Sequence, residues 1–127
     1  MYLFDNIASP NFKAAFDPAN FIQCGVLPYP HAYNLLKDNI VYLHIKDATS
    51  DGTVVPSGLG IGRLKELFAE LHKNNFEGFL AIEPHLVAFP GFENLKDETV
   101  LNQTMSAPEA FTLAYNSLAR ILEEIVQ

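Results

Sequence analysis

Segments of this chain with a hydrophobic residue at every second position alternate with segments in which hydrophobic residues recur every three to four positions. This alternation of strand-like and helix-like segments constrains the fold more than any other feature of the sequence. Strand-like runs are expected over residues 12–17, 40–47 and 79–83. Helix-like patterns follow them, near residues 31–38, over 63–74 and from Ser106 onward. Because helical crossovers join neighbouring parallel strands, three strand-then-helix units predict an α/β fold with a parallel sheet.

Two of the expected helices carry further signals. One is an apolar stripe at helical spacing, formed by Leu64, Leu67, Phe68 and Leu71. The other is a capping box, in which Ser106 precedes Glu109 by three residues, with Pro108 in the first turn. The apolar face of that last helix is expected to comprise Phe111, Ala114, Leu118, Ile121, Leu122 and Ile125.

Composition narrows the class of protein. The 127 residues are 49% hydrophobic and 18% charged, which predicts a single globular domain over residues 1–127. A net charge of −7 disfavours nucleic acid as a partner. No apolar run approaches the roughly 20 residues that span a bilayer, so we expect no membrane partner and a cytoplasmic protein. Cys24 is the only cysteine, so any metal would be held by His, Asp and Glu.

Ionisable side chains are expected at the ends of all three strands. Side chains alternate across a strand, so Asp17, His44 and Glu83 each lie opposite an apolar face. The apolar faces are Phe12, Ala14 and Phe16, then Val41, Leu43 and Ile45, then Leu80 and Ile82. In a barrel the second face is the interior, and functional residues lie at its C-terminal mouth.

These three residues allow two interpretations. Taken singly, a strand His is more often a hydrogen-bonded core residue, and a strand-terminal Asp or Glu often caps a loop or helix. Their occurrence at equivalent positions of three successive units favours a site for a divalent ion such as Mn²⁺, Co²⁺, Zn²⁺ or Mg²⁺.

Other candidate residues lie near the expected mouth. Lys46 could neutralise a substrate oxyanion or phosphate, or pair with Asp17 or Asp47. Asn20 is a candidate partner for a substrate hydroxyl, and His85 is a second imidazole near the mouth. The run Gly58–Gly62 could offer backbone N–H groups to an anion, but it is interpreted first as a flexible turn.

Four segments together resemble the C-terminal half of the xylose isomerase-like TIM barrels. They are residues 16–21 (FDPANF), 41–47 (VYLHIKD), 56–60 (PSGLG) and 80–85 (LAIEPH). The resemblance implies a divalent metal held at the strand ends, with Asp17, His44 and Glu83 as three of its four ligands. It also implies an isomerase or epimerase of a small sugar, sugar phosphate or polyol, in which Glu83 is one of two carboxylates that exchange a proton with substrate carbon.

The chain departs from the family in two respects. The sequence begins after the strand that carries the fourth ligand, a Glu, so we expect the isolated chain to be slower than a full barrel. Asn20 stands where ketose epimerases often have His, and no Arg occurs between Asp47 and Gly62. A complete barrel needs about 250 residues, so the chain is expected to be a partial barrel of the last three βα units.

The expected partial barrel leaves sheet edges and an interior face unpaired. These surfaces predict a homo-oligomer, with Ala15, Tyr42 and Phe79 near the contact. A catalytically inactive oligomeric half-barrel with a remnant metal site is therefore an alternative to the isomerase. Phosphodiester hydrolysis, found in a distant branch of the family, is disfavoured by the acidic charge and by too few His residues at the strand ends.

Overall fold

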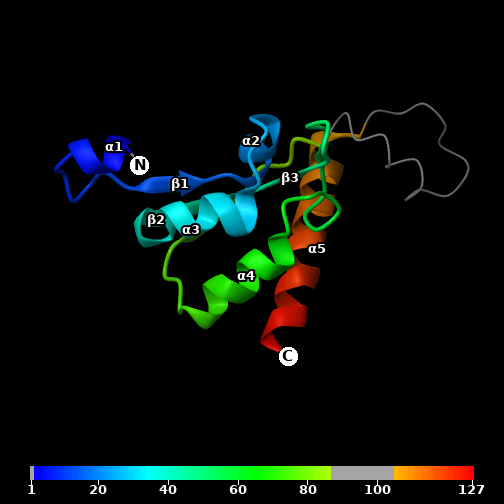
Figure 1. Cartoon of the computed structure of the whole chain (residues 1–127). Helices are drawn as coiled ribbons and strands as arrows, with labels where there is room; N and C mark the ends of the chain where they lie inside the picture. Colours follow the sequence, from blue (N-terminus) through cyan, green and yellow to red (C-terminus); the bar gives the residue numbers. More distant parts are fainter. Residues whose placement is uncertain (1, 87–104) are drawn as a thin grey trace, which may run out of the picture.

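A three-stranded parallel sheet forms the centre of the chain in the computed structural model, which describes residues 2–86 and 105–127 (Figure 1). Its strands lie in the order β1 (Ala14–Phe16), β2 (Ile40–Ile45) and β5 (Phe79–Ile82). Leu43 of β2 lies opposite Phe16 of β1 and Leu80 of β5. The predicted α/β class is confirmed, and the carboxyl ends of all three strands meet at one edge of the sheet.

Five α-helices accompany this sheet among the described residues. They are α1 (Tyr2–Asn6), α2 (Pro18–Gln23), α3 (Tyr33–Leu36), α4 (Leu64–Lys73) and α5 (Ala107–Val126). The helix expected over residues 31–38 is wrong as one element, because a π-helical turn (Pro28–Ala32) precedes α3 and a 3-10 turn (Lys37–Asn39) follows it. Tyr29 has extended backbone angles, so the turn before α3 is kinked at this residue.

The core lies between the sheet and the helices. The α4 stripe of Leu64, Leu67, Phe68 and Leu71 is buried, as predicted, against Phe16, Leu43 and Ile45 of the sheet. Helix α5 packs beside α4, and the predicted capping box of Ser106 and Glu109 is present at its start. None of the helices among the described residues has the length and apolar character that crossing a membrane requires.

Three residues predicted to lie on buried apolar faces are exposed: Val41, Phe111 and Leu80, which is 40% exposed. Val41 is 44% exposed while Ile40 is buried, because the pairing of β1 with β2 shifts register between Ala14 and Ala15. On α5, Phe111 is 50% exposed and Ala110 is buried in its place. Pattern alone places a residue on a face of its own element but does not show whether a neighbour covers that face.

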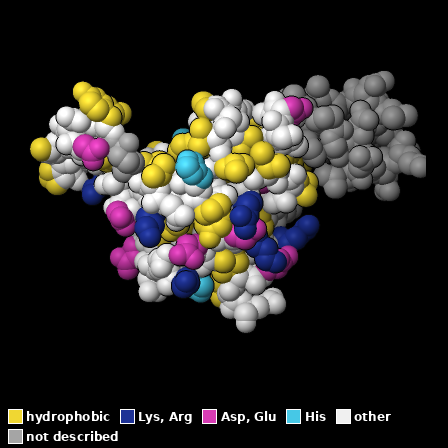
Figure 2. Space-filling view, viewed as in Figure 1, with side chains coloured by type: hydrophobic (Ala, Val, Ile, Leu, Met, Phe, Trp, Pro, Cys, Tyr) yellow, Lys and Arg dark blue, Asp and Glu magenta, His cyan; other side chains and the backbone are white. Residues whose placement is uncertain are grey.

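The second face of the sheet carries exposed side chains. Phe79 is 73% exposed, and its ring centroid lies 6.2 Å from that of the half-buried Tyr42. Helix α1 stands apart from the other helices and carries apolar atoms on its surface (Figures 1 and 2), with Tyr2 78% and Leu3 58% exposed.

The loop expected after β2 contains further structure. A two-stranded antiparallel sheet pairs β3 (Asp47–Ala48) with β4 (Val54–Val55), and the glycine-containing run follows it. Asp47 is completely buried, and its carboxylate accepts four backbone hydrogen bonds of 2.8 to 3.1 Å, from Ala48, Gly58, Gly60 and Gly62.

These hydrogen bonds require glycine in the run. A Cβ on Gly60 would overlap the Ala48 carbonyl oxygen and the Asp47 carboxylate. The turn expected over Gly58–Gly62 is present, and its N–H groups do bind an anion, which is the carboxylate of Asp47.

Candidate functional site

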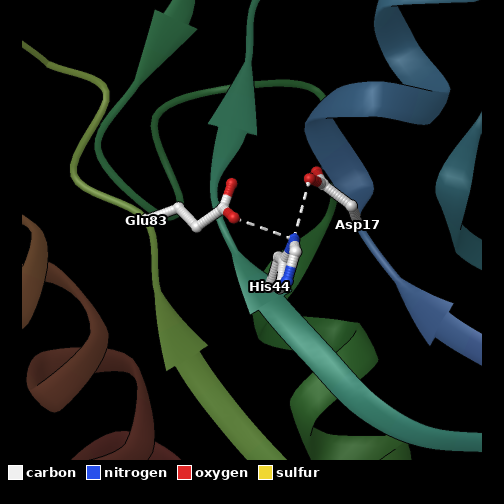
Figure 3. Close-up of side chains that lie close together, drawn as sticks. All are labelled: Asp17, His44 and Glu83. Carbon is white, nitrogen blue, oxygen red and sulfur yellow. Dashed lines mark ion pairs between the residues drawn. The ribbon is translucent and has the colours of Figure 1, made fainter.

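Three ionisable side chains meet at the carboxyl edge of the parallel sheet. Asp17 directly follows β1, His44 lies near the end of β2, and Glu83 directly follows β5 (Figure 3). Each offers one ligand atom, and these atoms all lie within 4.8 Å of one another. The structure thus brings together the three residues that the strand pattern placed on one face.

Asp17 is held by the start of α2 rather than by a strand, which corrects the strand expected over residues 12–17. It is the N-cap of that helix: its backbone is extended and its Oδ1 accepts the Asn20 N–H at 3.0 Å. Pro18 follows at the first helical position, where its missing N–H costs nothing. The capping interpretation therefore holds for one oxygen, and Oδ2 points toward His44.

The imidazole of His44 lies between the two carboxylates. Its Nδ1 is 3.0 Å from Glu83 Oε1 and 3.4 Å from Asp17 Oδ2, the two pairs drawn as dashed lines in Figure 3. The His44 and Glu83 side chains are 31% and 27% exposed, whereas Asp17 is buried. The group therefore opens to solvent on the side of His44 and Glu83.

Lys46 completes the group from the same face of the sheet. Its Nζ lies 2.9 Å from Glu83 Oε2 and 3.0 Å from Asp17 Oδ2, and its side chain is only 6% exposed. Of the two pairing partners considered for Lys46, the structure shows Asp17; Asp47 instead binds the glycine run.

Electrostatics in the group follow from these contacts. The hydrogen bond from Lys46 lowers the pKa of Glu83, more than partial burial raises it. Burial acts to lower the pKa of Lys46, but Glu83 and Asp17 together outweigh it, and that pKa is raised. Both groups are therefore held in their charged forms near neutral pH.

The donor set fits a divalent cation. Two carboxylates and an imidazole are ligands that Zn²⁺, Mn²⁺ and Co²⁺ accept. Asp17 Oδ2 is buried and accepts no well-aligned hydrogen bond from the described residues, although Lys46 Nζ is within ion-pair distance. A buried carboxylate oxygen with spare accepting capacity suits a further positive ligand.

The other candidate residues lie at the edge of the group. Asn20 is exposed, and the contact that links it to Asp17 is made by its backbone. His85 is exposed two residues after Glu83, and its backbone N–H donates to the Glu83 carbonyl oxygen at 2.8 Å. The sequence pattern did not identify Asp47 as the residue that binds the glycine run. The spacing of the three glycines in Gly58–Gly62 indicated a bound anion but not which group supplies it.

The parallel βα units, with an ionisable group at their carboxyl edge, define part of a (β/α) barrel. Residues 1–123 match the family of xylose isomerase-like TIM barrels, and the chain belongs to this family. No curated protein matches the chain.

Among solved structures, the chain is similar to a xylose isomerase domain protein from Planctomyces limnophilus. The sequences are 19% identical and the TM-score is 0.62, so this likeness shows the fold. The match covers 98% of this chain and 40% of that protein, which agrees with a partial barrel.

Proposed function

We propose that this chain carries the C-terminal half of the site of a metal-dependent isomerase or epimerase, which acts on a small sugar, sugar phosphate or polyol. The observation that supports this proposal is the convergence of Asp17, His44 and Glu83 from three successive strand ends. Membership of the xylose isomerase-like family supports the reaction class, because the family is named after an enzyme that isomerises a sugar.

Asp17, His44 and Glu83 would hold the divalent ion. When bound, such an ion supplies Lewis-acid polarisation of a substrate carbonyl and hydroxyl. Glu83 is the carboxylate that is open to solvent, and Lys46 keeps it ionised, so it suits the removal of a proton from a substrate carbon. Asn20 and His85 are exposed beside the group and would contact substrate hydroxyl or phosphate groups.

Proton–deuterium exchange tests this proposal. Ketoses, aldoses and their phosphates are incubated in D₂O with the chain and Mn²⁺, and NMR spectra are recorded after the ion is removed with a chelator. We expect exchange at one substrate C–H that falls about 10²–10⁴-fold in Glu83→Gln, because that variant lacks the general base. Glu70→Gln, on α4, is the matched control and should exchange at the wild-type rate.

We expect the wild-type rate itself to be slow. Among the described residues, Glu83 is the one carboxylate of the group that is open to substrate, because Asp17 is buried and caps α2. Inversion at carbon needs a second acid or base on the opposite side of the substrate. Exchange that is unaffected by Glu83→Gln, or absent from the wild type, would contradict the proposal.

The second candidate function is an inactive, self-associating half-barrel with a remnant metal site. The observation that favours it is the exposed second face of the sheet, where Phe79 is 73% exposed beside Tyr42, and Tyr42 in turn lies opposite the exposed Ala15 of β1. Among the described residues, β1 and β5 each pair with a single strand, β2, which leaves two edges for another copy.

Sedimentation equilibrium at micromolar concentration tests this self-association. We expect oligomers that Phe79→Glu shifts toward monomer, because a charge on an apolar contact must be desolvated. Leu59→Glu, at a loop residue that is 65% exposed, is the matched control and should leave the distribution unchanged. A folded wild-type monomer, or equal behaviour of the two variants, would contradict the prediction.

A further inference from the structure

Lys46 forms ion pairs with both carboxylates of the group, those of Asp17 and Glu83. Its ammonium lies 3.0 Å from Asp17 Oδ2 and 2.9 Å from Glu83 Oε2, and these residues follow different strands. Without the ammonium, the buried Asp17 carboxylate and the partly exposed Glu83 carboxylate would lie close together without a permanent positive charge, which is costly. Lys46 therefore joins the ends of β1 and β5 across β2.

The two carboxylates divide their oxygen atoms between different partners. Asp17 Oδ1 accepts the Asn20 N–H, and Glu83 Oε2 accepts the Lys46 ammonium. The remaining atoms, Asp17 Oδ2 and Glu83 Oε1, are the ones that lie against His44 Nδ1. Each carboxylate thus presents one oxygen toward the imidazole, and Asp17 Oδ2 is shared with Lys46.

The shared oxygen sets two cations in competition. A divalent ion bound through Asp17 Oδ2 and Glu83 Oε1 would lie close to the Lys46 ammonium, and like charges at such separations repel strongly where water is scarce. The carboxylates of Asp17 and Glu83 carry two negative charges, of which the ammonium already neutralises one.

We infer that Lys46 is a resident counter-ion: it holds Asp17 and Glu83 together in the metal-free chain and opposes the binding of a divalent cation to them. This inference deepens the proposed function, since it rests on the same group being a metal site. A positioning role alone predicts weaker metal binding when Lys46 is removed, whereas the counter-ion role predicts tighter binding. The coupling is reciprocal: the charge of Lys46 weakens the binding of the ion, and the bound ion weakens the ion pairs of Lys46 by the same free energy.

Isothermal titration with Mn²⁺ alone, combined with thermal unfolding, tests the inference on Lys46→Met. We expect the dissociation constant of Mn²⁺ to fall by about tenfold or more, because the repulsion is removed. Without metal, the variant should unfold at a lower temperature than the wild type, since its carboxylates lose their partner. Saturating Mn²⁺ should therefore raise its unfolding temperature by more than that of the wild type.

Two control variants separate charge from position. Lys73→Met makes the same change of net charge at a side chain that is 75% exposed, 3.9 Å from Glu70, and should match the wild type in both measurements. Lys46→Arg keeps the positive charge and should not bind Mn²⁺ more tightly than the wild type. Binding that is equally tightened in Lys46→Arg and Lys46→Met would show that the positive charge does not control the affinity, and would overturn the inference.

The outcomes distinguish this inference from the proposed function. Wild-type binding that is lost in His44→Ala, with no tighter binding by Lys46→Met, overturns the counter-ion role and leaves the metal site standing. Binding by Lys46→Met but not by the wild type supports the counter-ion role and contradicts a metal-dependent function for the native chain. Absence of binding by both overturns both proposals.

Discussion

Asp47→Ala is expected to lower the free energy of unfolding by about 3–5 kcal/mol. The Asp47 carboxylate is completely buried and accepts the N–H groups of Ala48, Gly58, Gly60 and Gly62. Removing it leaves these donors without their partner, and each buried donor left unpaired costs about 1–3 kcal/mol unless the loop opens to water. The loss should appear in urea unfolding as a lower midpoint.

Two further variants make this experiment specific. Asp47→Asn preserves the shape but replaces one acceptor oxygen with an NH₂ group, so its loss should lie between those of the wild type and Asp47→Ala. Asp38→Ala removes an exposed carboxylate and should change the free energy of unfolding by less than about 0.5 kcal/mol. A loss in Asp47→Ala no larger than that of Asp38→Ala would show that the glycine run does not depend on this carboxylate.

His44→Ala is expected to weaken the binding of Mn²⁺, Co²⁺ and Zn²⁺ by more than about 100-fold. Loss of a group that only supports a metal ligand typically costs about 10–100-fold, and His44 is proposed as a ligand itself. Its Nδ1 lies 3.0 Å from Glu83 Oε1 and 3.4 Å from Asp17 Oδ2, so its removal also takes away one of the two side chains that contact both carboxylates. Calorimetry on the whole chain measures the three affinities.

The matched control is His72→Ala, which removes an exposed imidazole from α4. His72→Ala should bind Mn²⁺, Co²⁺ and Zn²⁺ at the proposed site with the same affinity as the wild type. Only weak Zn²⁺ binding to the exposed His72 itself would be lost. If His44→Ala and the wild type bind these ions equally, the group of Asp17, His44 and Glu83 is not the metal site.

Local sequence patterns predicted several parts of the fold. The stripe of Leu64, Leu67, Phe68 and Leu71 is buried, and the capping box of Ser106 and Glu109 begins α5. Both signals depend on residues three to seven positions apart, whose relative placement follows from helix geometry alone. Strand geometry acts in the same local way: side chains alternate between the two faces, and this alternation placed Asp17, His44 and Glu83 on one side of the sheet.

Limits of this reasoning appear where an element meets its neighbours. Val41 and Phe111 belong to apolar patterns but are 44% and 50% exposed, because burial depends on what packs over them. A register shift between β1 and β2 moved Ile40 to the inside. Such a shift is a property of two strands together, and neither strand's sequence encodes it alone.

The sequence by itself determined the class of fold, the family likeness and the three side chains that converge at the carboxyl edge. Only the tertiary structure decided which carboxylates Lys46 contacts and which N–H groups donate to its neighbour Asp47. Lys46 reaches Glu83 across 37 residues of sequence, and Asp47 reaches Gly62 across 15. A charged side chain pairs with whichever opposite charge or N–H group lies within about 3 Å, and that distance is set by how the strands and loops pack.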